Sequence, residues 1–233
     1  RSDRSRLMLV ADSLAVALAV TLPWSTSATE ICVWLWLIAV IPTLDPGAVR
    51  RELLSPAGGL PVLLALLGLI GMAWAGVSIG ERIDGFKSFY KLLFVPLLIA
   101  HFSRSERGSW VLVGFIASCA VLLIVSWGLV LLPGLTWRGK WCSGVPVKDY
   151  IAQGALFVIC VLLLCERALV ALRNGRIRVA LAFTALACGF LSNILYVLTS
   201  RTALVIIPVL FALMGLKRLS WKPLLGFGGA AIV

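Results

Sequence analysis

The stretch NILYVLTSRTALVIIPVL, residues 193–210, decides how this chain folds, and its only charge is Arg201. From residue 179 to residue 216, Arg201 is the sole charged side chain in 38 residues. A single helix of that length would be about 57 Å long, nearly twice the hydrocarbon thickness of a bilayer. The run therefore predicts two membrane-spanning helices joined by a tight turn close to Arg201.

The composition of the whole chain is that of a membrane protein. Of its 233 residues, 61% are hydrophobic and 13% are charged, and the mean hydropathy is +1.05. A soluble domain carries about 25% charged residues. The apolar segments are also too long for barrel strands, which alternate over about 10 residues. We therefore expect an all-α, polytopic transmembrane helical bundle with about eight complete spans and one truncated span. The predicted apolar segments are 7–23, 28–42, 60–77, 86–102, 109–133, 150–166, 179–199, 202–216 and 223–233.

The basic residues predict an orientation in the membrane. If the N-terminus is cytoplasmic, the inner loops collect 14 of the 21 Lys and Arg residues, in accordance with the positive-inside rule. The net charge of +11 is then mainly a topology signal together with attraction to anionic membrane lipid, and it does not indicate nucleic-acid binding.

Seven basic residues fall on the disfavoured, outer side: Arg82, Lys87, Lys91, Arg138, Lys140, Lys148 and Arg201. Cations that converge from separate loops at one membrane face suit an anionic group such as a diphosphate. Each can instead extend to lipid phosphates, and this second interpretation is favoured for Lys140 and Lys148, which lie in an exposed loop. For the set as a whole we favour the binding interpretation, with Arg201 as the first candidate, because charges at membrane depth are costly and tend to be functional.

Three segments resemble the O-antigen ligases and O-antigen polymerases. TSRTALVIIPVLFALMG (199–215) is similar to the Ser-Arg signature of a module that both groups share. GMAWAGVSIGERIDGFKSFYKLLFVPLL (71–98) resembles their third-to-fourth-span region, and GVPVKDYIAQGALFVICVLLL (144–164) resembles a polar segment that enters the next span. The resemblance covers most of the chain in topology.

The resemblance implies glycosyl transfer at the outer face of a bacterial inner membrane. A glycan carried on undecaprenyl diphosphate would be the donor, and the acceptor would be the lipid A core for a ligase or another glycan repeat unit for a polymerase. No metal or other cofactor is implied. Arg201, Arg82, Lys87, Lys91 and Arg138 would bind the diphosphate and stabilise its departing charge.

The resemblance implies a catalytic histidine in a C-terminal outer loop, and this chain ends before such a loop. It begins RSDRSR without a methionine and ends inside the apolar run GFGGAAIV. We therefore expect residues 1–233 to be a single transmembrane domain of a longer protein, inactive alone, whose catalytic residues are unknown. His101 lies at the inner end of its predicted span and is interpreted as an interfacial polar residue.

A membrane transporter or flippase is the alternative from another class. It predicts ionisable residues near the middle of the membrane, and only Asp12 is a plausible interior carboxylate. Asp12 lies near the inner end of the first predicted span, where we expect it to reach an arginine or water. The six cysteines show no metal-ligand spacing.

Overall fold

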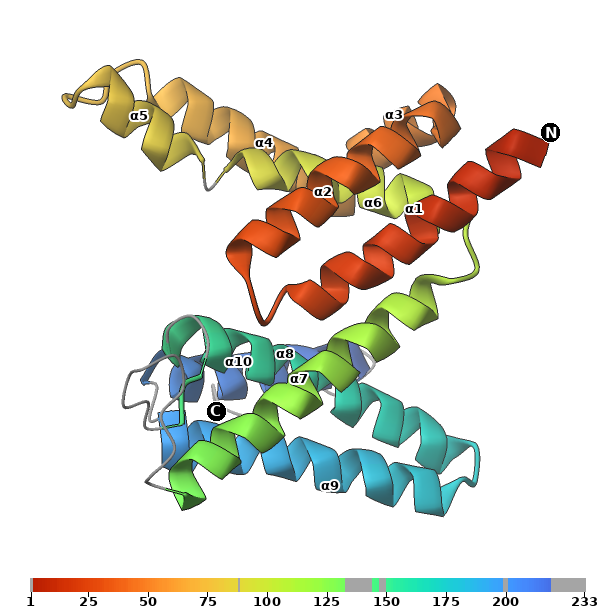
Figure 1. The fold of residues 1–233 in the computed structure, drawn as a ribbon, viewed down its shortest axis with the longest axis vertical. Coiled ribbons are helices and arrows are strands. Elements are labelled where there is room, and N and C mark those ends of the chain that lie inside the picture. The colour runs from red at the N-terminus through yellow and green to blue at the C-terminus, as the bar shows by residue number, and fades with distance from the viewer. Residues whose placement is uncertain (1, 88, 133–143, 147–149, 199–200, 219–233) are drawn as a thin grey trace, which may run out of the picture. The chain divides into compact units, whose positions relative to one another are not determined.

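The computed structural model describes residues 2–87, 89–132, 144–146, 150–198 and 201–218, and these are helical nearly throughout (Figure 1). Within these ranges no strand occurs, so the prediction of an all-α chain is confirmed. The chain divides into two compact units, residues 1–19 with 27–114 and residues 20–26 with 115–233. The expectation of a single transmembrane domain stays a prediction.

The first unit contains most of α1 and the helices up to α6. Their bounds are α1 (Ser2–Thr21), α2 (Thr26–Val40), the 3-10 turn η1 (Ile41–Thr43), α3 (Pro46–Leu54), α4 (Pro56–Gly71), α5 (Ile79–Phe86), the 3-10 turn η2 (Tyr90–Leu93) and α6 (Phe94–Phe102). Within this unit α6 packs against α3 and α4.

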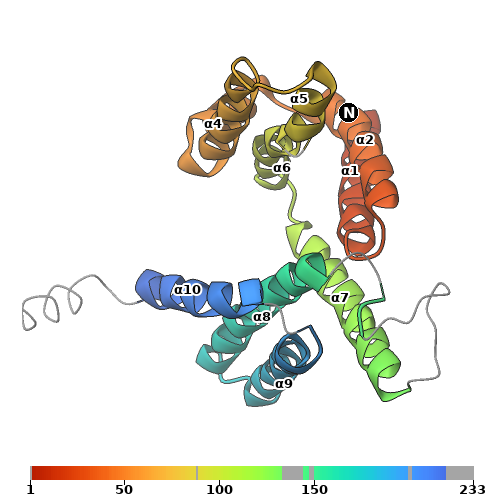
Figure 2. The same cartoon turned by 90° about the vertical axis from the view of Figure 1, so that its left-hand side faces the viewer.

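The second unit contains most of α7 and the helices that follow it. Their bounds are α7 (Gly108–Leu131), α8 (Tyr150–Arg173), α9 (Ile177–Asn193), the π-helix η3 (Ile194–Leu198) and α10 (Arg201–Arg218). Helices α8 and α9 form an antiparallel hairpin and lie side by side (Figure 1; Figure 2), while α10 packs against α8.

Local sequence sets the bend between α3 and α4, which measures 78°. The side chain of Ser55 accepts a hydrogen bond from the backbone N–H of Gly58, and Pro56 occupies the first helical turn, where its missing N–H costs nothing. A Cβ on Gly58 would collide with the backbone carbonyl of Glu52. Gly58 therefore allows the close approach of the two helices at the bend.

Each unit has its own apolar core. In the first unit, Trp36 and Val40 of α2 pack with Ala11 and Ala15 of α1. Leu97 and the neighbouring apolar residues of α6 surround this cluster. Small residues on α1 let the large indole of Trp36 become almost fully buried, at 1% exposure.

In the second unit, Phe157 of α8 and Phe190 of α9 meet edge to face, with ring centroids 4.9 Å apart. Both side chains are fully buried. This pair holds the centre of the α8–α9 hairpin together.

Several helices have the length and composition of membrane spans. Among the described residues, four qualify: Thr26–Thr43, Gly108–Leu131, Tyr150–Arg173 and Ile177–Leu198. A fifth is obtained if the bent pair α3 and α4 is one span. A multi-pass membrane protein is therefore supported, whereas the count of eight complete spans stays a prediction. The ninth predicted segment, 223–233, lies outside the described residues.

Two predicted spans differ in the structure. The segment predicted over 60–77 is helical only as far as Gly71, where α4 ends. The segment predicted over 86–102 is helical from Tyr90, and the short helix α5 precedes it. Ser78 starts α5 by forming a reciprocal capping box with Glu81, which makes this polar segment a separate helix.

Candidate functional site

Arg201 is the first residue of α10, and its side chain lies outside the described part of the structure. Helical structure runs through η3 to Leu198 and resumes at Arg201. Residues 199 and 200, between these two elements, lie outside the described residues, so the expected pair of membrane-spanning helices joined by a tight turn close to Arg201 stays a prediction. The N-terminus of a helix presents unpaired backbone N–H groups and the positive end of the helix dipole, and both attract anions.

Arg82 is tied to the main chain of its own segment. Its Nε donates a hydrogen bond to the carbonyl of Val77 at 2.9 Å, and its Nη1 donates to the carbonyl of Met72 at 3.1 Å. Met72 is the C-cap residue of α4. The guanidinium thus fixes the turn between α4 and α5, and its remaining N–H groups stay open to an anion.

Lys87 and Lys91 each form an exposed ion pair. The Nζ of Lys87 lies 2.6 Å from Oδ1 of Asp84, and the Nζ of Lys91 lies 3.2 Å from Oε1 of Glu30. The hydrogen bond and negative charge of Asp84 raise the pKa of Lys87. Exposed pairs of this kind contribute little to stability, so both ammonium groups can exchange their partners for a stronger anion.

The predicted cations are only partly brought together. Arg82, Lys87 and Lys91 share the first unit, and Arg201 belongs to the second. Arg138 lies outside the described residues. The convergence of the whole set on one anion therefore stays a prediction.

A buried polar network lies at the end of α9. The hydroxyl of Ser126 on α7 donates to the carbonyl of Gly144 at 2.5 Å and accepts a hydrogen bond from Nδ2 of Asn193 at 3.0 Å. Gln153 on α8 donates to the same hydroxyl at 3.3 Å. Asn193 is the last residue of α9, immediately before the π-helix that leads toward Arg201.

This network fixes the segment around Gly144 to three helices. Gly144 has a φ of +80°, which favours glycine, and an added Cβ would collide with the side chain of Val197. The side chains of Ser126, Gln153 and Asn193 are almost fully buried. The sequence did not indicate the network, although Ser126, Gln153 and Asn193 are uncharged polar residues within long apolar helices.

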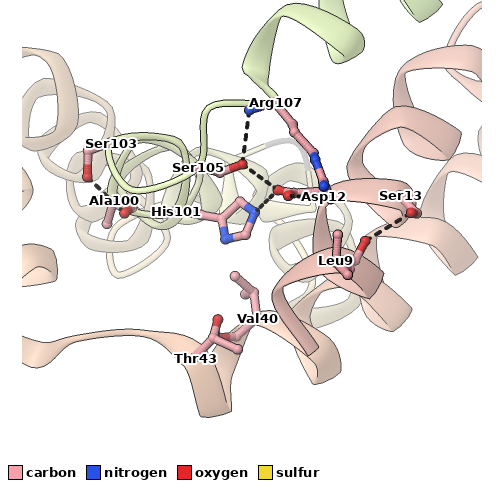
Figure 3. Close-up of polar contacts among 10 residues, drawn as sticks. All are labelled: Leu9, Asp12, Ser13, Val40, Thr43, Ala100, His101, Ser103, Ser105 and Arg107. Carbon is pink, nitrogen blue, oxygen red and sulfur yellow. Dashed lines mark hydrogen bonds and ion pairs between the residues drawn. The ribbon is translucent and has the colours of Figure 1, made fainter. Parts of the chain in front are cut away.

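A second buried network centres on Asp12 in the first unit (Figure 3). Oδ1 of Asp12 accepts hydrogen bonds from Nε2 of His101 and from the hydroxyl of Ser105, each at 2.8 Å. The same hydroxyl accepts the backbone N–H of Arg107 at 3.2 Å, and Nη1 of Arg107 lies 3.9 Å from Oδ2 of Asp12. The network thus joins α1 to α6 and to the segment that leads into α7.

His101 is buried within the first unit, and its interpretation as an interfacial residue stays a prediction. Its exposed fraction is 3%, and its ring meets that of Trp36 edge to face, with centroids 6.2 Å apart. Asp12 does reach an arginine, as expected, but its main partner is the imidazole. A carboxylate and an imidazole in hydrogen-bond contact can hold and transfer a proton.

A pocket of about 330 Å³ adjoins this network and is lined by Asp12, Ser13, Val16, Arg107 and Trp110. Its lining combines one carboxylate, one guanidinium and an indole. Among the described residues no group of three His, Cys, Asp or Glu side chains is placed to hold a metal ion.

Comparison with protein-family models, with curated proteins and with solved structures finds no match to this chain. The family resemblance therefore rests on the sequence motifs alone.

Proposed function

We propose that this chain belongs to a membrane glycosyltransferase of the O-antigen ligase type. It would transfer a glycan from undecaprenyl diphosphate to the lipid A core at the periplasmic face of a bacterial inner membrane. The observation that carries the proposal is that Arg201, the one charge of the 179–216 run, is the first described residue of α10.

The proposed role of Arg201 is electrostatic. The diphosphate gains negative charge as the glycosidic bond to it breaks, and a preorganised cation stabilises that charge more in the transition state than in the ground state. The guanidinium and the N-terminus of α10 both supply positive potential. Arg82, Lys87, Lys91 and Arg138 are proposed as further donor-binding residues, whereas the base that activates the acceptor is unknown.

The topology that goes with this function has a cytoplasmic N-terminus and about eight complete spans. It places the predicted donor-binding cations on the periplasmic side, where a lipid-linked glycan would be presented.

Replacing Arg201 by Ala in the full-length protein tests the proposal. Loss of one stabilising donor typically costs about 100–1,000-fold in turnover. We expect glycan-bearing lipid A core to fall at least about a hundredfold on gels while the protein level in the membrane stays unchanged. Arg173→Ala, at the exposed end of α8, is the matched control. Transfer at the unaltered level in R201A would refute the assignment.

An O-antigen polymerase is the alternative within the same class. It would use the same donor and the same cations, and its product would be a longer lipid-linked glycan instead of a modified lipid A core. The chain length of the product in the unaltered strain and in R201A separates the two activities.

A transporter or flippase is the second candidate, and the buried pair of Asp12 and His101 favours it. Ionisable pairs inside membrane proteins often serve proton coupling. A transporter would lose activity in Asp12→Asn and tolerate Arg201→Ala, whereas the transferase should show the opposite pattern.

A further inference from the structure

The pocket beside Asp12 has an open acceptor at its edge. Oδ1 of Asp12 takes the hydrogen bonds from His101 and Ser105, whereas Oδ2 accepts no hydrogen bond from the described residues. The 3.9 Å separation between Oδ2 and Nη1 of Arg107 is too long for a hydrogen bond. One carboxylate oxygen is thus held rigidly, and the other is free to accept an N–H donor.

Arg107 offers the complementary charge. Its side chain is 51% exposed, and among the described residues its guanidinium donates no hydrogen bond. The planar guanidinium matches the geometry of a phosphate and can bind it through two parallel hydrogen bonds. A carboxylate oxygen that can accept a hydrogen bond and a guanidinium that can bind an anion therefore lie a few ångströms apart in the lining of one pocket.

Val16 and Trp110 form the apolar part of the pocket lining. Trp110 is 67% exposed, and its indole can stack on an ammonium group. Val113, one turn further along α7, is 65% exposed and lies on the same face of the helix. An acyl chain can run along this face once its headgroup occupies the pocket.

The size of the pocket limits the ligand. About 330 Å³ is at the lower end of the range for small-molecule sites. It suits a compact headgroup and is too small for an oligosaccharide repeat unit on a lipid carrier.

We propose that this pocket binds a small zwitterion with an ammonium and a phosphate, in the form of an ethanolamine phospholipid headgroup. The ammonium donates to Oδ2 of Asp12, and the phosphate accepts from Arg107. The inference is independent of the glycosyl-transfer function.

Native mass spectrometry of the purified chain tests the site. The chain is mixed with equal amounts of phosphatidylethanolamine, phosphatidylcholine and phosphatidylglycerol. Phosphatidylcholine lacks the N–H donors, and phosphatidylglycerol lacks the ammonium. We expect phosphatidylethanolamine to be retained preferentially. Asp12→Asn and Arg107→Gln should each weaken its binding about tenfold, because each removes a charge-assisted contact.

The matched controls are Glu106→Gln and Arg50→Gln, which remove one charge of each sign at exposed positions outside the pocket. They should leave lipid retention unchanged. If Asp12→Asn does not fold, Arg107→Gln and Trp110→Ala still test the site, because their side chains are exposed.

Competition with free phosphoethanolamine distinguishes the sources of the ligand. Displacement of the lipid at millimolar concentration supports a site for the soluble zwitterion, and failure to displace it supports a lipid site that also needs the acyl chains. Equal retention of the three lipids would overturn the proposal, as would an unchanged preference in both Asp12→Asn and Arg107→Gln.

Discussion

The contact between Asp12 and His101 can be measured with a double-mutant cycle of Asp12→Ala, His101→Ala and the double variant. The Oδ1–Nε2 distance is 2.8 Å, and the two side chains are 10% and 2% exposed. Water therefore screens the contact little, and loss of one partner leaves the other polar group buried. Removal of one member of a buried pair costs about 3–5 kcal/mol.

The coupling energy isolates the contact itself. Hydrogen bonds to charged groups contribute about 1.5–3 kcal/mol, so the double variant should be less destabilised than the sum of the single variants by about 2 kcal/mol. The free energy of unfolding can be followed in detergent micelles, with SDS as denaturant and tryptophan fluorescence as signal. Trp36 is suited to report the change, because its ring contacts that of His101.

The matched cycle pairs Ser13→Ala with His101→Ala. Ser13 lies next to Asp12 on α1, and its hydroxyl donates to the carbonyl of Leu9 within the same helix. We expect these two substitutions to add within about 0.5 kcal/mol. A coupling energy for Asp12 and His101 that is no larger than this control would refute the idea that the pair holds α1 to α6.

Two further predictions concern the connecting segments. Gly144→Ala should destabilise the protein by about 1–3 kcal/mol more than Gly175→Ala in the same unfolding assay, because both glycines have positive φ but only the Cβ at 144 meets neighbouring side chains. Hydrogen bonds from Ser78 lower the pKa of Glu81 below its ordinary value of 4.5. The capping box is therefore fully stabilising above that value and is lost as the pH falls through the lowered pKa. The backbone N–H of Ser78 donates to Glu81, so its protection factor against hydrogen exchange should fall in that acidic range, and it should change less with pH in Glu81→Gln.

The prediction of two spans with a turn close to Arg201 rests on length alone. A 38-residue apolar run cannot cross a bilayer once, and Arg201 is its only charge. The span between residues 60 and 77 was predicted less well, because the run stays apolar past Gly71, where α4 ends. The capping box of Ser78 and Glu81 was readable in the sequence as a Ser-x-x-Glu pattern, and it explains why α5 is separate.

The partners of Asp12 were not predictable, because they are set by how helices distant in sequence pack. His101 lies 89 residues from Asp12, and each residue taken alone resembles a polar group at the end of a span. The same holds for Ser126 and Asn193, which are 67 residues apart. A polar side chain in an apolar helix indicates that a partner is present, since leaving it unpaired in hydrocarbon is costly. The sequence does not indicate which helix supplies that partner.

The two charged residues in apolar segments, Asp12 and Arg201, require different interpretations. The buried charge of Asp12 is compensated within its own unit by His101, Ser105 and Arg107. These contacts offset most of the free-energy cost of burying the carboxylate, so a structural role accounts for its position. The side chain of Arg201 lies outside the described residues, so its proposed role rests on its being the only charge of the 179–216 run. The free oxygen of Asp12 is a feature that packing alone does not require. Function is therefore best sought at the Oδ2 side of Asp12 and at the first turn of α10, and not at the hydrogen bonds that already hold the helices together.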